Sequence, residues 1–228
     1  MKRTTMTMAL MLGLTLATPY AAAEGRARVH GAKENAEGGV TAGSATAYSG
    51  PGDARGVRGH AVSTDGAGDA KVVSGGTGKG PNGGSYGRAG STRVGDGTLD
   101  HKSGGFVHGA NGAYASRRGS TVINSNGSVQ HSGAANGSGP NGSFNTAGNF
   151  SRNPDGTYSG QRSTTATGAN GSYSGDTQYA NGSASHTTDY TAKNGDTYAG
   201  DTTWTKGEGV THSGTCKDAS GKVIACPR

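Results

Sequence analysis

An Asn-Gly or Asp-Gly pair returns at a nearly constant interval through most of this chain. The pairs are Asn82-Gly83, Asp96-Gly97, Asn111-Gly112, Asn126-Gly127, Asn141-Gly142, Asp155-Gly156, Asn170-Gly171, Asn181-Gly182 and Asn194-Gly195. Successive pairs are 14, 15, 15, 15, 14, 15, 11 and 13 residues apart. This regular spacing identifies a tandem repeat of about 15 residues.

Each pair predicts a hairpin turn. In a type I′ turn both central residues need a positive φ, which Gly accepts freely and Asn or Asp accept better than most residues. Residues 171–179 and 187–204 alternate and are rich in Thr and Tyr, and no window has apolar residues at helical spacing. We therefore predict an all-β fold, a Gly-rich antiparallel β-meander. A β-solenoid and low-complexity disorder are the alternatives.

The repeats carry few large apolar side chains. With one or two of them in each repeat, the buried core is expected to be thin. Stability would then come from backbone ladders and from cross-strand pairs of Tyr, Thr and Ser, which contribute roughly 0.2–1 kcal/mol each.

Residues 1–23 have the pattern of a secretory signal peptide. Lys2 and Arg3 precede an apolar run over residues 6–17, and Ala21-Ala22-Ala23 matches an A-x-A cleavage site. The run is too short to span a bilayer. We therefore expect an exported protein, in the periplasm, at the cell surface or secreted, and a bacterial source.

Residues 24–81 differ from the repeats in composition. They are rich in Gly and Ala, and Tyr48 is their only aromatic residue. So little apolar surface is not expected to offset an ordering entropy of roughly 1–2 kcal/mol per residue. This composition predicts a flexible arm before a repeat region over residues 82–210.

Residues 211–228 depart from the repeat and contain both cysteines, Cys216 and Cys226. In an exported protein an even pair indicates a disulfide, here closing a small hairpin. We expect this hairpin to cap the last repeat and to cover one edge of the sheet.

Charge is distributed unevenly along the repeats. Residues 82–154 carry six basic and two acidic side chains, whereas residues 155–205 carry two basic and five acidic ones. Complementary halves predict head-to-tail association of copies. A basic chain is also suited to anionic polymers, although its basic residues are scattered in sequence apart from Arg117-Arg118, and no nucleic-acid-binding motif is present.

No motif indicates catalysis. Matches to G-x-S-x-G and G-x-G-x-x-G occur, but 45 glycines in 228 residues produce such matches by chance. The seven histidines are spread along the chain, and His101 and His108 would share a metal only if they lay on neighbouring strands. We expect no enzyme, cofactor or metal site.

These features predict a structural protein of the cell envelope or extracellular matrix that self-associates head to tail or through strand edges. In composition, residues 82–204 resemble secreted Gly-, Ser- and Asn-rich bacterial repeat proteins, including amyloid-type biofilm subunits, but they lack the longer repeat of curli-type subunits. The alternative is a non-catalytic binding module for polysaccharide or anionic polymers. Its candidate stacking residues are Tyr114, Tyr158, Tyr173, Tyr179, Tyr190, Tyr198 and Trp204. That alternative requires Tyr158, Tyr173 and Tyr198 to share one exposed face.

Overall fold

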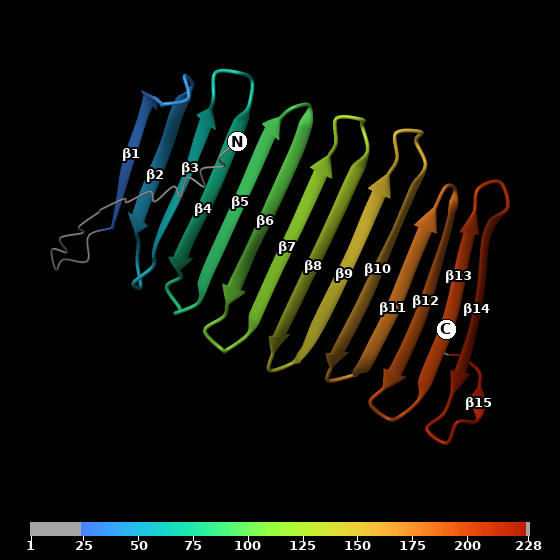
Figure 1. Ribbon diagram of the computed structural model, residues 1–228. Coiled ribbons are helices and arrows are strands. Elements are labelled where there is room, and N and C mark those ends of the chain that lie inside the picture. Colours follow the sequence, from blue (N-terminus) through green and yellow to red (C-terminus); the bar gives the residue numbers. More distant parts are fainter. Residues whose placement is uncertain (1–23, 227–228) are drawn as a thin grey trace, which may run out of the picture.

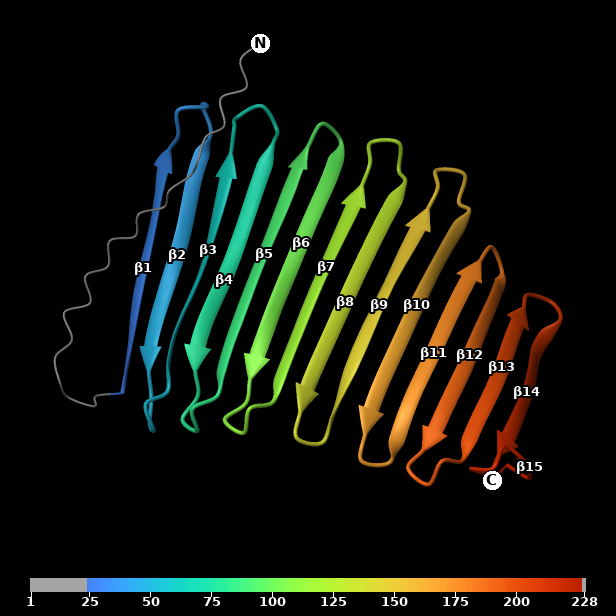
Figure 2. The same ribbon diagram turned by 60° about the horizontal axis from the view of Figure 1, so that its bottom comes forward.

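The computed structural model describes residues 24–226 as a single antiparallel sheet of fifteen strands. Each strand pairs with the strands before and after it in sequence, so the sheet is a meander and the predicted fold is confirmed. The strands lie side by side in sequence order in one continuous, twisted layer, and no second layer of described residues covers either face (Figures 1 and 2). The predicted signal peptide lies outside the described residues.

The strands are similar in length apart from the last. They are β1 (Gly25–Glu34), β2 (Val40–Ser49), β3 (Arg55–Thr64), β4 (Ala70–Lys79), β5 (Ser85–Gly95), β6 (Thr98–His108), β7 (Tyr114–Ile123), β8 (Val129–Gly139), β9 (Gly142–Arg152), β10 (Tyr158–Gly168), β11 (Gly171–Ala180), β12 (Ser183–Ala192), β13 (Thr197–Thr205), β14 (Gly209–Lys217) and β15 (Val223–Ile224).

The prediction of a flexible arm over residues 24–81 is wrong. Strands β1–β4 occupy this segment and continue the ladder of β5 without a break. Composition misled the prediction because a strand in this sheet is held mainly by backbone hydrogen bonds to its neighbours. Those bonds do not need large apolar side chains.

The pairs lie at or beside hairpin turns, as predicted, but most of the turns are not type I′. Only Asp96 and Asn181, with φ of 50° and 41°, have the positive φ that type I′ requires before the following Gly. Five turns instead place the Gly alone in the left-handed region: Gly83, Gly112, Gly127, Gly156 and Gly195. In each, the Gly N–H donates to the carbonyl three residues earlier, a type I turn with a Gly bulge. The two remaining pairs belong to two-residue loops, Pro140-Asn141 and Ala169-Asn170. Their glycines, Gly142 and Gly171, are the first residues of the strands that follow.

The Asn or Asp before the bulge Gly fixes the loop with its side chain. Asn126 Oδ1 accepts the N–H of Ser128 at 3.0 Å, and Asp155 Oδ1 accepts the N–H of Thr157 at 2.9 Å. The same bond forms in the loops of Asn111 and Asn194. An Asx-turn of this kind explains why the loop selects Asn or Asp even where φ is negative.

The sheet buries fewer than one residue per strand. Six of the described residues are buried, and four of these are glycines: Gly39, Gly87, Gly137 and Gly175. The other two are Thr46 and Cys216. A Cβ on Gly87, Gly137 or Gly175 would collide with the ring of Phe106, Phe144 or Tyr173 respectively. Aromatic rings lying over glycine backbone therefore take the place of a packed interior.

The chain exposes far more surface than a globular protein of its mass. Its accessible area is 16113 Å², against roughly 9,500 Å² expected for a compact protein of this size. Residues 1–23 can account for at most about 3,500 Å² of the difference. Both faces of the sheet are therefore largely open to solvent.

Because aromatic rings lie over glycines, we predict that adding a methyl group to such a glycine lowers the stability of the fold. Replacing Gly160, which Phe150 and Tyr179 flank on either side, with Ala would push a Cβ into the Tyr179 ring and to 2.7 Å from the Asn149 carbonyl oxygen. We expect Gly160→Ala to lower the free energy of unfolding by about 1–3 kcal/mol in urea titration. Gly90→Ala, whose Cβ would meet nothing nearer than 3.5 Å, serves as the control. An equal loss in both variants would contradict this account.

Three loop aspartates accept hydrogen bonds that favour their charged form. A hydroxyl hydrogen bond from Thr157 lowers the pKa of Asp155, and one from Ser220 lowers that of Asp218. A backbone N–H two residues further on lowers the pKa of Asp65. Because the folded pKa lies below the unfolded value of about 3.9, these groups stabilise the fold above that pH, and their contribution is lost as the pH falls through the folded pKa.

The fold should therefore weaken in acid through these loops. We expect a combined Asp65→Asn, Asp155→Asn and Asp218→Asn variant to lose less stability than the natural chain between pH 6 and pH 2.5 in urea titration. The amide keeps the Oδ1 acceptor but does not titrate. An equal loss of stability in the variant and the natural chain over this pH range would contradict this account.

Candidate functional site

The two faces of the sheet carry different side chains. Residues directly opposite each other on paired strands lie on the same face, and successive residues alternate. Ten aromatic residues fall on one face, which we call the aromatic face: Tyr48, Tyr86, Phe144, Phe150, Tyr158, Tyr173, Tyr179, Tyr190, Tyr198 and Trp204. The opposite, polar face has Phe106 and Tyr114 as its aromatic residues in the described strands.

Charge is also sorted between the faces. The cations that strands present on the aromatic face are all arginines: Arg26, Arg28, Arg58, Arg88, Arg117, Arg152 and Arg162. Within the described strands, every lysine and four of the five carboxylates lie on the polar face, namely Asp100, Asp176, Asp189 and Asp201. The fifth carboxylate, Glu34, ends β1 on the aromatic face. Sequence spacing suggested scattered basic residues, but the register aligns them.

Six of the seven predicted stacking residues share the aromatic face. Tyr158, Tyr173 and Tyr198 are among them. Tyr158 and Trp204 are 36% and 41% exposed, whereas Tyr173 and Tyr198 are half-buried. Tyr114 lies instead on the polar face, where its ring centroid is 4.8 Å from that of His108. The alternation within β7 separates Tyr114 from the others.

The aromatic residues concentrate at the C-terminal end. We define the C-terminal aromatic patch as the aromatic-face side chains of β9–β14, which include eight of the ten rings. Phe150 and Tyr179 stack across β10 with centroids 6.3 Å apart. Trp204 lies directly opposite Val210, which is 66% exposed. From β11 to β14 this surface carries no Asp, Glu, Lys or Arg.

Histidines on the aromatic face form a repeated pair that sequence reasoning missed. In five cases the Nδ1 atom is hydrogen-bonded to a hydroxyl directly across the ladder: Ser44–His60, Thr92–His101, Thr121–His131, Thr177–His186 and Thr202–His212, at 2.8–3.3 Å. The signal was a Thr or Ser at the position opposite each His, which is visible only once the register is known. The condition for a shared metal at His101 and His108 is not met, because both lie in β6 and on opposite faces.

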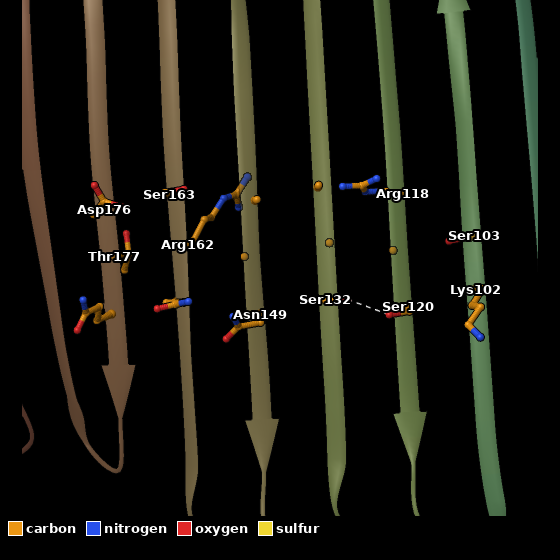
Figure 3. A pocket seen from close by; sticks show the side chains of 17 residues that line it. Lys102, Ser103, Arg118, Ser120, Ser132, Asn149, Arg162, Ser163, Asp176 and Thr177 are labelled. Carbon is orange, nitrogen blue, oxygen red and sulfur yellow. Dashed lines mark hydrogen bonds between the residues drawn. The ribbon is translucent and has the colours of Figure 1, made fainter.

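A shallow polar hollow of about 690 Å³ lies over β6–β11 (Figure 3). Six polar side chains cross it in one row of direct partners: Lys102, Ser120, Ser132, Asn149, Gln161 and Gln178. Ser120 and Ser132 are hydrogen-bonded at 2.9 Å. The residues the structure describes contain no group of three or more His, Cys, Asp or Glu placed to hold a metal ion.

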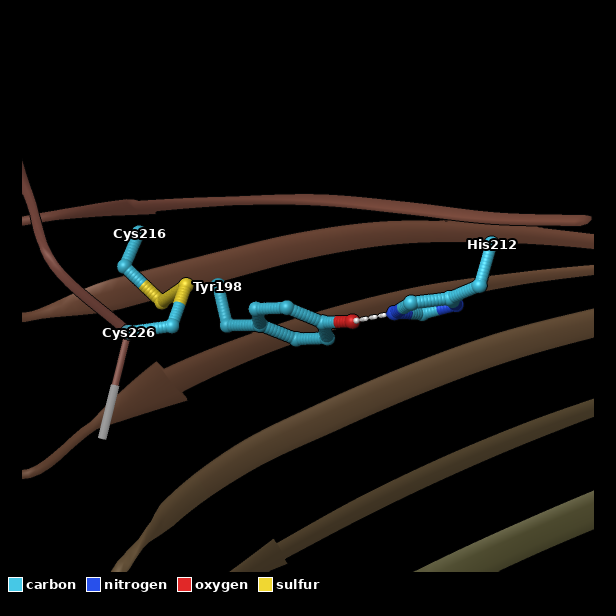
Figure 4. The surroundings of a disulfide bond; sticks show 4 residues. All are labelled: Tyr198, His212, Cys216 and Cys226. Atoms are coloured by element: carbon cyan, nitrogen blue, oxygen red, sulfur yellow. Dashed lines mark hydrogen bonds between the residues drawn. A yellow bond between two sulfur atoms is a disulfide. The ribbon is translucent and has the colours of Figure 1, made fainter. Parts of the chain in front are cut away.

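The predicted disulfide is present and closes the C-terminal end of the sheet. Cys216 and Cys226 are bonded with Cα atoms 5.3 Å apart, and β15 pairs with the last two residues of β14. Tyr198 lies directly opposite Cys216, and its hydroxyl is hydrogen-bonded to His212 Nε2 at 3.1 Å (Figure 4). The disulfide thus fixes the strand beside the C-terminal aromatic patch.

Comparison of the chain with protein-family models, curated proteins and solved structures finds no match. Over residues 24–226 there is no helical segment with the length and apolar character needed to cross a bilayer.

The disulfide should stabilise the last hairpin more than the rest of the sheet. Closing a loop with a sequence separation of 10 residues contributes about 3 kcal/mol in the loop-entropy estimate. We expect a Cys216→Ser, Cys226→Ser variant to show faster amide hydrogen exchange over residues 209–226 and unchanged exchange in β5–β9. Uniformly faster exchange would show instead that the cap supports the whole sheet.

Proposed function

We propose that this chain is an exported structural protein whose sheets associate with one another through the C-terminal aromatic patch. The observation that carries the proposal is a surface of eight aromatic rings, free of charged side chains from β11 to β14, on a sheet that has no second layer among the described residues. Exposed apolar area of this extent marks an interaction surface in a folded protein. Covering it with a second copy would supply the packed layer that a single sheet lacks.

The patch is large enough for a stable interface. Six strands about 4.8 Å apart and ten residues of about 3.3 Å each span roughly 900 Å². A standard protein interface buries about 800 Å² on each partner. Tyrosine and tryptophan are also the residues that contribute most at the centres of interfaces.

The faces are better suited to this association than the edges of the sheet. β1 carries Arg26, Arg28, Lys33 and Glu34, and charged side chains on an edge strand oppose pairing with a further strand. At the other end, β15 pairs with Cys216 and Lys217 of β14, and residues 209–215 of that strand have no further strand beside them among the described residues. We favour stacking through a face over edge-to-edge pairing because the aromatic rings lie on the face.

Export is supported by two independent features. A disulfide persists in an oxidising compartment and is rare in the cytosol. The first 23 residues match a secretory signal in sequence, although they lie outside the described residues. We therefore place the proposed assembly in the cell envelope or outside the cell.

Removing apolar surface from the patch should weaken association. We expect Trp204→Thr combined with Val210→Thr to raise the dissociation constant of self-association at least tenfold in analytical ultracentrifugation. These two side chains are direct cross-strand partners and are 41% and 66% exposed.

The matched control uses the neighbouring pair on the polar face. Thr203→Ala with Thr211→Ala changes the same two strands on the other side of the sheet and should leave association unchanged. A natural chain that stays monomeric at all concentrations contradicts self-association. An equal loss in the control assigns the contact to the wrong face.

A further inference from the structure

Four arginines stand in one row on the aromatic face, at every second strand of the N-terminal half. Arg28 in β1, Arg58 in β3, Arg88 in β5 and Arg117 in β7 are linked through direct ladder partners. The residues between them in the row are small: Thr46, Gly76 and Gly105. With strands about 4.8 Å apart, the arginines repeat at about 9.6 Å. We call them the arginine row.

Two tyrosines, Tyr48 and Tyr86, lie beside the arginine row, and we call them the tyrosine wall. The Tyr48 and Tyr86 hydroxyls are hydrogen-bonded at 2.8 Å, and both rings crowd Gly78, where an added Cβ would lie 2.8–2.9 Å from their atoms. The hydrogen bond to Tyr86 raises the pKa of Tyr48, whereas the nearby charge of Arg58 acts in the opposite direction. With Arg26, Arg58 and Arg88, the two tyrosines line a hollow of about 550 Å³.

The arginines have no acidic partner among the described residues. The ion pair found among the described residues joins Lys102 and Asp100 on the polar face. Among the described strands, Glu34 is the one residue with a carboxylate on the aromatic face. It lies at the opposite end of β1 from Arg26. The side chains of the arginine row are exposed. Unpaired guanidiniums aligned over a small-residue floor form a linear site for anionic groups.

We infer that the arginine row binds a linear acidic polysaccharide laid across the strands, with one carboxylate for every two sugars. A guanidinium binds a carboxylate through two parallel N–H donors, a geometry that lysine does not offer. A polymer whose acidic sugar alternates with a neutral one repeats its charge over two sugar rings, close to the spacing of two strands. The tyrosine wall offers ring and hydroxyl contacts to the sugars between the charges.

The spacing of the arginines also fits this polysaccharide better than it fits a nucleic acid. A DNA strand carries a phosphate about every 3.4 Å along the duplex axis, so an arginine every 9.6 Å or so would leave most phosphates unpaired. An alternating acidic polysaccharide fits this arrangement better than a nucleic acid does.

The test measures fluorescence anisotropy of labelled hyaluronan, which alternates an acidic with a neutral sugar, on the oxidised chain at 50 mM salt. We expect binding that is lost at high salt, and at least tenfold weaker binding by a variant with Arg28, Arg58, Arg88 and Arg117 changed to Gln. The matched control changes the polar-face cations Arg55, Lys71, Arg93 and Arg118 to Gln. It removes the same charge from β3–β7 and should bind as the natural chain does. Circular dichroism checks that both variants keep the β fold.

Three outcomes overturn the inference. Equal losses in the two variants would mean that net charge attracts the polymer without a site. Tighter binding of labelled oligothymidylate than of hyaluronan would assign the row to nucleic acid. No hyaluronan binding at low salt would remove the site.

This site does not depend on the proposed self-association, because it uses β1–β7 and not the C-terminal aromatic patch. The Trp204→Thr, Val210→Thr variant is therefore expected to bind hyaluronan normally while it fails to associate. The arginine variant is expected to show the reverse. The two proposals can thus fail separately.

Discussion

The fold depends on a continuous antiparallel backbone ladder that is not supported by a packed interior. Fourteen strand pairings in sequence order hold the chain, and each satisfies the backbone polar groups of its neighbours. The side chains add a second device, in which rings such as Phe144 and Tyr173 lie over the glycine backbone. An aromatic residue covering a glycine protects the ladder from water at a point where no side chain can do so. Gly and Tyr are therefore used together, and the abundance of Gly is a packing requirement as well as a turn requirement.

The same ladder accounts for the asymmetry of the two faces. Direct partners share a face, so side chains placed at matching positions of successive repeats line up in rows across the sheet. Ten of the twelve rings and seven of the ten arginines in the described strands follow one set of rows, while the Lys, Asp and amide side chains of the strands follow the other. One face thereby gains an apolar end and a cationic end with almost no carboxylate. A sheet with such a face is suited to two different contacts, one with a further sheet and one with an anionic polymer.

Much of the fold could be predicted, and the errors have identifiable causes. The Asn-Gly interval gave the meander and the hairpin positions because those residues suit tight turns. The turn type was wrong in most loops, since the Asn or Asp side chain, as at Asn126, fixes the loop without a positive φ of its own. Composition does not predict strands β1–β4, because their order comes from backbone pairing that continues to β5 and not from apolar side chains.

The sequence by itself determined the repeat, the turns, the β class and the cysteine pair, since each of these depends on residues close together in the chain. Only the tertiary structure decided which residues share a face. Arg28 and Arg117 are 89 positions apart, and the rows that join them depend on the register of six successive pairings. A shift of one residue in any pairing would turn every later side chain to the opposite face. The candidate sites are therefore properties of the register, which the loops and ladders fix together.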